Sequence, residues 1–477
     1  MKKEDKMTHN PYTTYADLLA AITADSGTEI INPATDEVVG TYRQATVEDL
    51  NEAVSTARAA QREFAGLSDA ERSQLLLQAA DAIEASGEAL VELLSREQGK
   101  PLNGPNARFE VGACAAWLRA TASFDSPDYT AVDDDITATV SYRPLGVVGA
   151  IGPWNWPMMI TVWQIAPALR MGNAVVIKPS EYTPLSVLAL VKVINTVLPE
   201  DLVQVVAGGG EVGAALSTHG GIDKLMFTGS TATGKKIVEA SAQGLTRLTL
   251  ELGGNDAGIV LEDADPAAIA GDLFWGAFIN TGQTCAAMKR LYVPAALYDD
   301  VCAALVAVAQ ASPMGVGIEE ENVLGPLQNK QQFDIVDRLV KEATAAGARV
   351  LVGADPDYGA PGNFYPTTLV ADIDPDNPLV VEEQFGPALP IIKYEDLDWA
   401  IDEANKLDVG LGSSVWSSDR AKAREVAARL EAGTTWINSH GAVDPRVPFG
   451  GIKSSGYGVE FGTEGLKGLA YPHIING

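Results

Sequence analysis

Short apolar runs alternate with helical stretches along most of the chain. Residues 48–98 carry apolar side chains at helical spacing and predict two helices, one starting near Val47 and one near Ala70. From residue 146 the pattern changes to short β-branched or apolar runs at 146–151, 174–178, 202–206 and 224–228, and a second alternating set lies between residues 258 and 437. Because alternating strands and helices are joined by right-handed crossovers, we expect two α/β domains with largely parallel sheets.

Two strand-like segments have no obvious local partner. Residues 136–142 alternate as an exposed strand does, and residues 468–475 are mostly apolar. Taken alone, these segments are either edge strands of the adjacent domains or parts of a separate small element.

Composition is typical of a folded protein with two or three domains. The chain has 477 residues, of which 46% are hydrophobic and 20% charged. No apolar run reaches the roughly 18 to 20 residues that span a bilayer, and the first residues lack the apolar core of a signal peptide. Three cysteines, Cys114, Cys285 and Cys302, cannot form a disulfide framework, so we expect a reducing cytoplasm.

The formal net charge of −29 disfavours nucleic acid and anionic membranes as partners, because both repel an acidic surface. Two interpretations of this charge stay open. The chain is either an ordinary cytosolic enzyme with an acidic surface or a protein adapted to high salt. Residual activity in molar salt would separate them.

A carboxylate and a lone cysteine provide candidate chemistry. Glu251 begins the segment Glu-Leu-Gly-Gly-Asn and lies 34 residues before Cys285, which follows Gly-Gln-Thr and precedes a predicted strand. A thiol that attacks a carbonyl and a carboxylate that activates water are the groups that covalent acyl chemistry needs. Cys114 and Cys302 lie in Ala-rich helical patterns and are interpreted as buried apolar residues. The four histidines show no pairing with Cys285, and no spacing of ligands predicts a metal site.

Two glycine patterns resemble nucleotide-binding motifs without completing them. Residues 208–213 fit G-x-G-x-x-G, but no acidic residue follows about 20 positions later. Residues 229–235 nearly form a P-loop, but Lys236 stands where a magnesium ligand is needed. Gly229 and Ser230 still form a tight turn before a predicted helix, whose N-terminus favours a phosphate. Lys178 and Glu181 follow a predicted strand, where parallel sheets bind ligands.

These motifs, together with Pro-Trp-Asn-Trp-Pro at 153–157, resemble the NAD(P)-dependent aldehyde dehydrogenase superfamily from about residue 30 onward. The resemblance implies an α/β fold with a Rossmann-like cofactor domain (1–122 and 142–252) and a catalytic domain (253–445). It also implies a small β oligomerisation arm with the C-terminal tail (123–141 and 446–477). The arm would pair with a second subunit, so we expect a homodimer or homotetramer.

The same resemblance implies roles for individual residues. Cys285 would be the nucleophile and Glu251 the base that activates water, while Asn155 and the Cys285 N–H would bind the oxyanion. Glu251 favours hydrolysis over transfer to coenzyme A. NAD is expected rather than NADP, because Glu181 would repel a 2′-phosphate. The expected cofactor-binding residues are Trp154, Lys178, Glu181, Gly209, Gly213, Gly229, Ser230, Leu252, Glu383 and Phe385.

The resemblance leaves the substrate open. The expected pocket residues are Trp156, Met159, Ile160, Trp163, Thr284 and Phe449, which together favour an apolar aliphatic or aromatic aldehyde. Arg446 is either a solvated loop residue or a partner for the carboxylate of a semialdehyde such as succinate semialdehyde. Two other classes of protein stay open: a non-catalytic structural protein of the same fold, and a cysteine esterase that would not need Lys178, Glu181 or Ser230.

Overall fold

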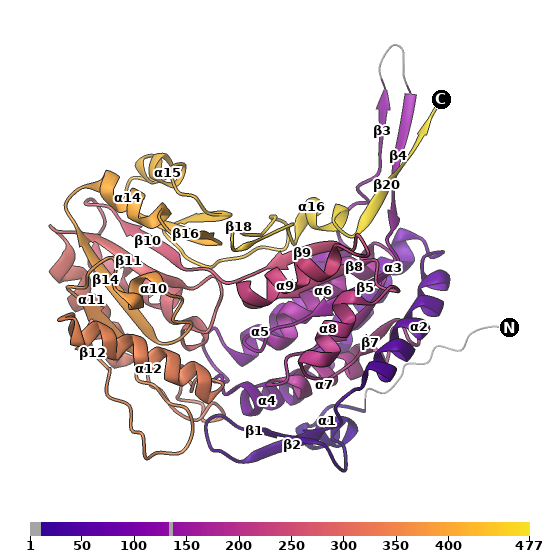
Figure 1. The fold of residues 1–477 in the computed structure, drawn as a ribbon, viewed down its shortest axis with the longest axis horizontal. Coiled ribbons are helices and arrows are strands. Elements are labelled where there is room, and N and C mark those ends of the chain that lie inside the picture. Colours follow the sequence, from indigo (N-terminus) through magenta and orange to yellow (C-terminus); the bar gives the residue numbers. More distant parts are fainter. Residues whose placement is uncertain (1–10, 133–136) are drawn as a thin grey trace.

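The computed structural model describes residues 11–132 and 137–477 and contains two large, mainly parallel sheets (Figure 1). In the first sheet the strand order is β19-β9-β8-β5-β6-β7, and only β19 is antiparallel to its neighbour. Its strands are β5 (Val147–Ile151), β6 (Ala174–Lys178), β7 (Val203–Val205), β8 (Lys224–Thr228), β9 (Arg247–Glu251) and β19 (Gly456–Tyr457).

The second sheet has the order β12-β13-β14-β11-β10-β16-β17, with β12 antiparallel to β13 and the other neighbours parallel. Its strands are β10 (Asp256–Val260), β11 (Met288–Pro294), β12 (Arg349–Val352), β13 (Thr368–Ala371), β14 (Ala388–Tyr394), β16 (Gly412–Trp416) and β17 (Thr434–Ile437). Consecutive residues of β11 enter different cores, Leu291 on one face and Tyr292 on the other. Both faces of this sheet are therefore covered, as expected for parallel sheets.

Helices cover and connect these sheets. In the first half they are α1 (Tyr15–Ile22), α5 (Ala107–Ala122), α6 (Pro157–Arg170), α7 (Pro184–Ile194), α8 (Gly210–Thr218) and α9 (Thr231–Ser241). In the second half they are α10 (Pro266–Phe278), the short η1 (Ile279–Gly282), α11 (Tyr298–Ala311), α12 (Lys330–Ala345), α13 (Pro378–Val381), α14 (Leu397–Asn405), α15 (Arg420–Ala427) and α16 (Gly462–Lys467). Short strands β1 (Thr28–Ile31) and β2 (Val38–Tyr42) pair with each other, as do β15 (Val409–Gly410) and β18 (Ile452–Lys453).

The prediction of two helices over residues 48–98 was wrong, because the structure has three. They are α2 (Val47–Phe64), α3 (Asp69–Ala85) and α4 (Gly87–Gln98). Ser86 has φ −102° and ψ 10°, which ends α3 and begins α4 one residue later. Continuous helical spacing of apolar residues conceals a one-residue break of this kind. Thr46 and Ser68 form capping boxes with Asp49 and Glu71, which fix the starts of α2 and α3.

A narrow three-stranded sheet projects from the rest of the molecule (Figure 1). It consists of β3 (Tyr129–Val132), β4 (Thr137–Pro144) and β20 (Ala470–Asn476), and we call it the arm. The two segments that lacked a local partner in the sequence thus pair with each other, Val140 opposite Ile474. The predicted strand begins at Ile136, which lies outside the described residues. Large apolar side chains remain exposed on the arm, namely Tyr129, Val132, Tyr471, Ile474 and Ile475.

Two of the three cysteines lie in helical cores, as predicted. Cys114 on α5 and Cys302 on α11 are buried, whereas Cys285 is partly exposed. Among the residues that the structure describes, no helix combines the length and apolar character needed to cross a bilayer.

Candidate active site

A cleft of about 880 Å³ lies at the carboxyl edge of the first sheet. Ile151, Lys178, Thr228 and Glu251 end the parallel strands β5, β6, β8 and β9, and all four line the cleft. This is the edge at which open parallel sheets bind ligands. Cys285, which follows η1 and precedes a strand of the second sheet, also lines the cleft. Strand ends of the first sheet and a loop that leads into the second sheet therefore share one cavity.

A left-handed stretch of backbone positions Cys285. Asn280 and Thr281 have φ values of 49° and 57°, and Gly282 follows with φ 78°. A Cβ at Gly282 would overlap the backbone of Gly386, so this position requires glycine both for its conformation and for its close packing. The left-handed conformation is costly for Asn280 and Thr281, which are not glycines, and such strain is often found at functional sites.

The side chain of Asn155 is directed at this loop. Its Nδ2 donates a hydrogen bond of 2.8 Å to the carbonyl of Gln283, two residues before Cys285. One amide hydrogen remains for a ligand, since an asparagine amide carries two. Among the described residues, no backbone carbonyl accepts from the Cys285 N–H. Two donors, one from each sheet region, thus lie next to the cysteine.

The Cys285 thiol lies in an unfavourable electrostatic environment for ionisation. Removal from bulk water raises its pKa to about 12, and the carboxylates of Glu251, Asp256 and Glu383 act in the same direction. The ammonium group of Lys289 opposes them and lowers the pKa. Because the thiolate is the reactive form, a nearby positive charge increases the reactivity of this residue at neutral pH.

Glu251 is a buried carboxylate that forms no ion pair with any of the residues described. The residue is 5% exposed, and neither of its oxygens has a hydrogen-bond partner among the described residues. Burial raises its pKa well above the usual range, and the neighbouring Glu460 raises it further. Burial also raises the pKa of Glu460 to about 8, while Lys224 lowers it. A carboxyl group with a raised pKa, facing a cleft, is suited to accept a proton near neutral pH.

A buried ion pair, which the sequence did not predict, supports the backbone of Asn155. Lys100 Nζ lies 2.5 Å from Glu110 Oε2 and donates a 2.8 Å hydrogen bond to the Asn155 carbonyl. The other oxygen of Glu110 accepts from the backbone N–H groups of Met158 and Met159, at the start of α6. These contacts fix the turn that carries Asn155.

Nine of the ten predicted cofactor residues line the cleft. Ser230 caps α9 and accepts a hydrogen bond from the Thr233 N–H, as expected for a residue that opens a helix. Gly209 is the exception, because it caps α8 and the adjacent Gly210 lines the cleft instead. The nine are Trp154, Lys178, Glu181, Gly213, Gly229, Ser230, Leu252, Glu383 and Phe385.

Sequence reasoning missed several cleft residues. Gln331 and Gln332 come from α12, which belongs to the second half of the chain, and Tyr182 and Lys236 come from the first half. No motif surrounds the two glutamines, so their place follows only from the way α12 packs. Tyr182 follows Glu181, and Lys236 follows the glycine-rich segment 229–235. Their position beside these predicted residues could have indicated that they line the cleft.

The predicted substrate residues lie outside this cleft as the described residues define it. Trp156, Met159, Ile160 and Trp163 are buried on or just before α6. Trp156 Nε1 donates a 2.9 Å hydrogen bond to Thr284 Oγ1, which ties the predicted pocket to the residue before Cys285.

The other candidates for substrate contacts lie farther along the chain. Phe449 is buried and stacks on Phe461, with ring centroids 6.1 Å apart. The side chain of Arg446 is 76% exposed and forms an ion pair with Asp444. The structure thus gives Arg446 the environment of a solvated loop residue.

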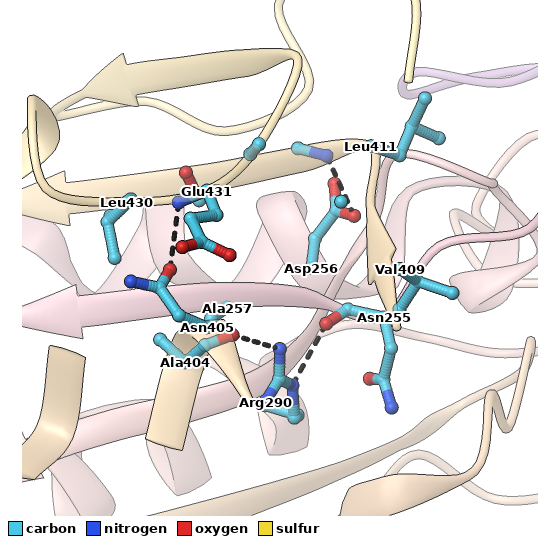
Figure 2. Close-up of a pocket in the computed structure, with 14 residues that line it drawn as sticks. Asn255, Asp256, Ala257, Arg290, Ala404, Asn405, Val409, Leu411, Leu430 and Glu431 are labelled. Atoms are coloured by element: carbon cyan, nitrogen blue, oxygen red, sulfur yellow. Dashed lines mark hydrogen bonds between the residues drawn. The ribbon is translucent and has the colours of Figure 1, made fainter. Parts of the chain in front are cut away.

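A second, much smaller pocket lies in the second sheet region (Figure 2). Its volume of about 10 Å³ is room for roughly one water molecule. Figure 2 shows that Arg290 donates to the carbonyls of Asn255 and Ala404, and that Asp256 accepts from the Gly412 N–H. These contacts tie β10 and β11, the strands before and after Cys285 in the chain, to their surroundings, and their role is structural.

Comparison with known proteins agrees with this geometry. The profile of the aldehyde dehydrogenase family matches residues 21–474. Geranial dehydrogenase of Castellaniella defragrans is 39% identical, with 92% of each chain covered, and phenylacetaldehyde dehydrogenase of Pseudomonas fluorescens is 37% identical, with 93% of this chain and 91% of the relative covered.

Solved structures give the same result. An NAD-dependent aldehyde dehydrogenase from Sinorhizobium meliloti superposes with a TM-score of 0.91 at 33% identity, covering 95% of this chain and 92% of the other. Betaine aldehyde dehydrogenase from Staphylococcus aureus, in complex with NAD+, gives a TM-score of 0.89 at 31% identity, with the same coverage. The chain therefore belongs to the aldehyde dehydrogenase family, whose members are oxidoreductases that act on aldehydes.

Proposed function

We propose that this protein oxidises an apolar aldehyde to a carboxylic acid with NAD as the electron acceptor. The observation that carries the proposal is that Cys285, Glu251 and Asn155 line the same cleft as Lys178, Ser230 and Glu383. A nucleophile, a buried base and an amide donor thus face a cavity that also offers groups for ribose and phosphate.

The cleft suits a dinucleotide. Lys178 ends β6 and Glu181 follows it, and the two present a donor and an acceptor for ribose hydroxyls. Ser230 lies at the N-terminus of α9, which favours a phosphate. A Cβ at Gly229 would lie 2.6 Å from the Phe227 ring, so the chain is close-packed at this turn. NAD+ is bound in the Staphylococcus aureus relative, and the carboxylate of Glu181 disfavours a 2′-phosphate.

The residues of the chain account for both halves of the reaction. The Cys285 thiolate adds to the aldehyde carbonyl, and the Asn155 amide and the Cys285 N–H stabilise the oxyanion. NAD, when bound, accepts the hydride. Glu251 then takes a proton from a water molecule that attacks the Cys285 thioester, and the acid is released.

The substrate class rests on two kinds of support. Trp156, Met159, Ile160 and Trp163 are apolar and buried, and they follow Asn155 along the chain, on or just before α6. Relatives at 39% and 37% identity are named for geranial and phenylacetaldehyde, both apolar aldehydes. The ion pair of Arg446 with Asp444 leaves the semialdehyde alternative without a specific observation in its favour.

The direct test is NADH formation, followed by absorbance, with aliphatic, aromatic, semialdehyde and amino-aldehyde substrates and with NAD and NADP in parallel. We expect turnover of apolar aldehydes with NAD. Preference for a charged semialdehyde would contradict the substrate class, and absence of NAD binding in a tryptophan-fluorescence titration would contradict the function itself.

We also propose that residues 1–122 and 142–252 form the cofactor domain, 253–445 the catalytic domain, and 123–141 with 446–477 the oligomerisation region. The exposed Ile474 and Ile475 of the arm support a homodimer or homotetramer. Light scattering should show that Ile475→Glu dissociates the oligomer, whereas an unchanged mass would exclude this edge from the interface. The three free cysteines support a cytoplasmic location.

A further inference from the structure

Lys289 is a buried lysine that takes no direct part in the reaction steps described above. It is the second residue of β11 and lies four positions after Cys285, and its side chain is only 2% exposed. Its Nζ donates hydrogen bonds to the carbonyls of Cys285 at 2.6 Å and of Thr284 at 3.0 Å. Through these hydrogen bonds, Lys289 fixes the backbone of the loop that carries the nucleophile Cys285.

The same ammonium group contacts a cleft carboxylate. Lys289 Nζ lies 3.3 Å from Glu383 Oε1, an oxygen that also accepts a 3.2 Å hydrogen bond from the Gly254 N–H. The Glu383 side chain is 30% exposed and lines the cleft. One buried cation thus contacts the Cys285 loop on one side and a ligand-facing carboxylate on the other.

The charges of Lys289 and Glu383 act on the thiol in opposite directions. Lys289 lowers the pKa of Cys285, and Glu383 raises it. The two groups also act on each other, because Lys289 lowers the pKa of Glu383 while burial raises it. A buried ammonium is costly unless it is paired, so its position depends on both sets of partners.

We propose that Lys289 is a positioning residue that couples the ligand-facing carboxylate of Glu383 to the reactivity of Cys285. The coupling to NAD rests on the proposed function. Ribose hydroxyl groups of NAD that donate to Glu383 compete with Lys289 for this carboxylate. The Lys289 ammonium is then less neutralised by Glu383, and its charge acts more strongly on the Cys285 loop. Such coupling is reciprocal, so the state of the thiol also affects the affinity for the ligand.

The first test needs no cofactor. The rate of Cys285 alkylation by iodoacetamide, located by mass spectrometry, is measured against pH for the wild type, Lys289→Met and Glu383→Gln. At a fixed pH below the midpoint of the thiol titration, we expect the alkylation rate to fall roughly tenfold in Lys289→Met, the loss of thiolate that one pKa unit gives, and to rise in Glu383→Gln. Lys393→Met, which removes an exposed lysine of β14, is the matched control and should superpose on the wild type.

Opposite shifts in the two variants distinguish electrostatic coupling from a merely structural role, since loosening of the loop would move both profiles the same way. The proposal would be overturned if the alkylation profile of Lys289→Met superposed on that of the wild type. It would also be overturned if the profiles of both variants moved to higher pH. If Lys289→Met does not fold, the Glu383→Gln profile still decides, because a profile of this variant that does not move to lower pH would overturn the proposal. Lys289→Arg keeps the charge and should keep the wild-type profile.

The second test adds NAD to the same titration. NAD should lower the midpoint in the wild type and leave it unchanged in Lys289→Met. An equal shift in both proteins would overturn the coupling. Absence of NAD binding to the wild type, by fluorescence, would instead contradict the proposed function, while the cofactor-free profiles would still decide the role of Lys289 toward Cys285.

Discussion

Two glutamates near Cys285 have contrasting surroundings. Glu251 has no hydrogen-bond partner for either oxygen among the described residues, and the charged group that shifts its pKa is another carboxyl group, Glu460. Glu383 has a buried cation at 3.3 Å and a backbone donor. Burial raises both pKa values, but only Glu383 has a cation that opposes the change. The unpaired carboxylate is suited to move protons, and the paired one is suited to hold a ligand.

The largest expected effect on turnover comes from replacing Glu251, the glutamate without an ion pair. Glu251→Gln should lower steady-state turnover by about 10² to 10⁴-fold, the range that general acid–base catalysis contributes. A burst of NADH should remain, because the first half of the proposed reaction does not use this base. Stopped-flow absorbance checks both features. Unchanged turnover would remove Glu251 from the mechanism and break the contrast.

A smaller effect is expected from replacing Glu383, the glutamate that is paired with Lys289. Glu383→Gln should raise the KM for NAD about tenfold or more, because hydrogen bonds to a charged group contribute about 1.5 to 3 kcal/mol. The NADH burst should keep its stoichiometry. Initial rates at varied NAD measure the effect. A loss of hydrolysis with unchanged KM would mean that the two glutamates had been assigned the wrong way round.

The smallest expected effect is on the pH dependence of hydrolysis, and it comes from replacing Glu460, the carboxyl group next to Glu251. Glu460→Gln removes a group that raises the pKa of Glu251, so this pKa should fall and the base should be ionised at lower pH. The acid limb of thioester hydrolysis should therefore move to lower pH. Glu464→Gln, an exposed change on α16, is the control. An upward shift in Glu460→Gln would contradict the electrostatic assignment.

The sequence predicted the residues whose neighbours along the chain carry a motif. Cys285, Glu251 and Asn155 each lie in a short recognisable segment, and the structure brings them to one cleft. Alternating apolar runs likewise predicted two parallel sheets, which the structure confirms. Both kinds of prediction use information that is local in the chain.

Contacts between distant segments were not predictable in this way. Lys289 meets Glu383 and Lys100 meets the Asn155 carbonyl only after the fold is formed, and a single buried lysine has no characteristic pattern. The break at Ser86 was missed, and the residues alone did not predict that β4 pairs with β20, although the family resemblance assigned both segments to one arm. One is a single-residue change of backbone angle, and the other joins segments with no shared local signal.

The arm also constrains how the protein is made. Ser141 and His473, hydrogen-bonded across β4 and β20, lie 332 positions apart in the chain. At about 5 to 20 residues per second, a ribosome needs on the order of tens of seconds to add the second strand after the first. During that time β4 has an open edge, which is a template for pairing with other nascent chains. Formation of the arm, and of any assembly built on it, is therefore a late event in biogenesis.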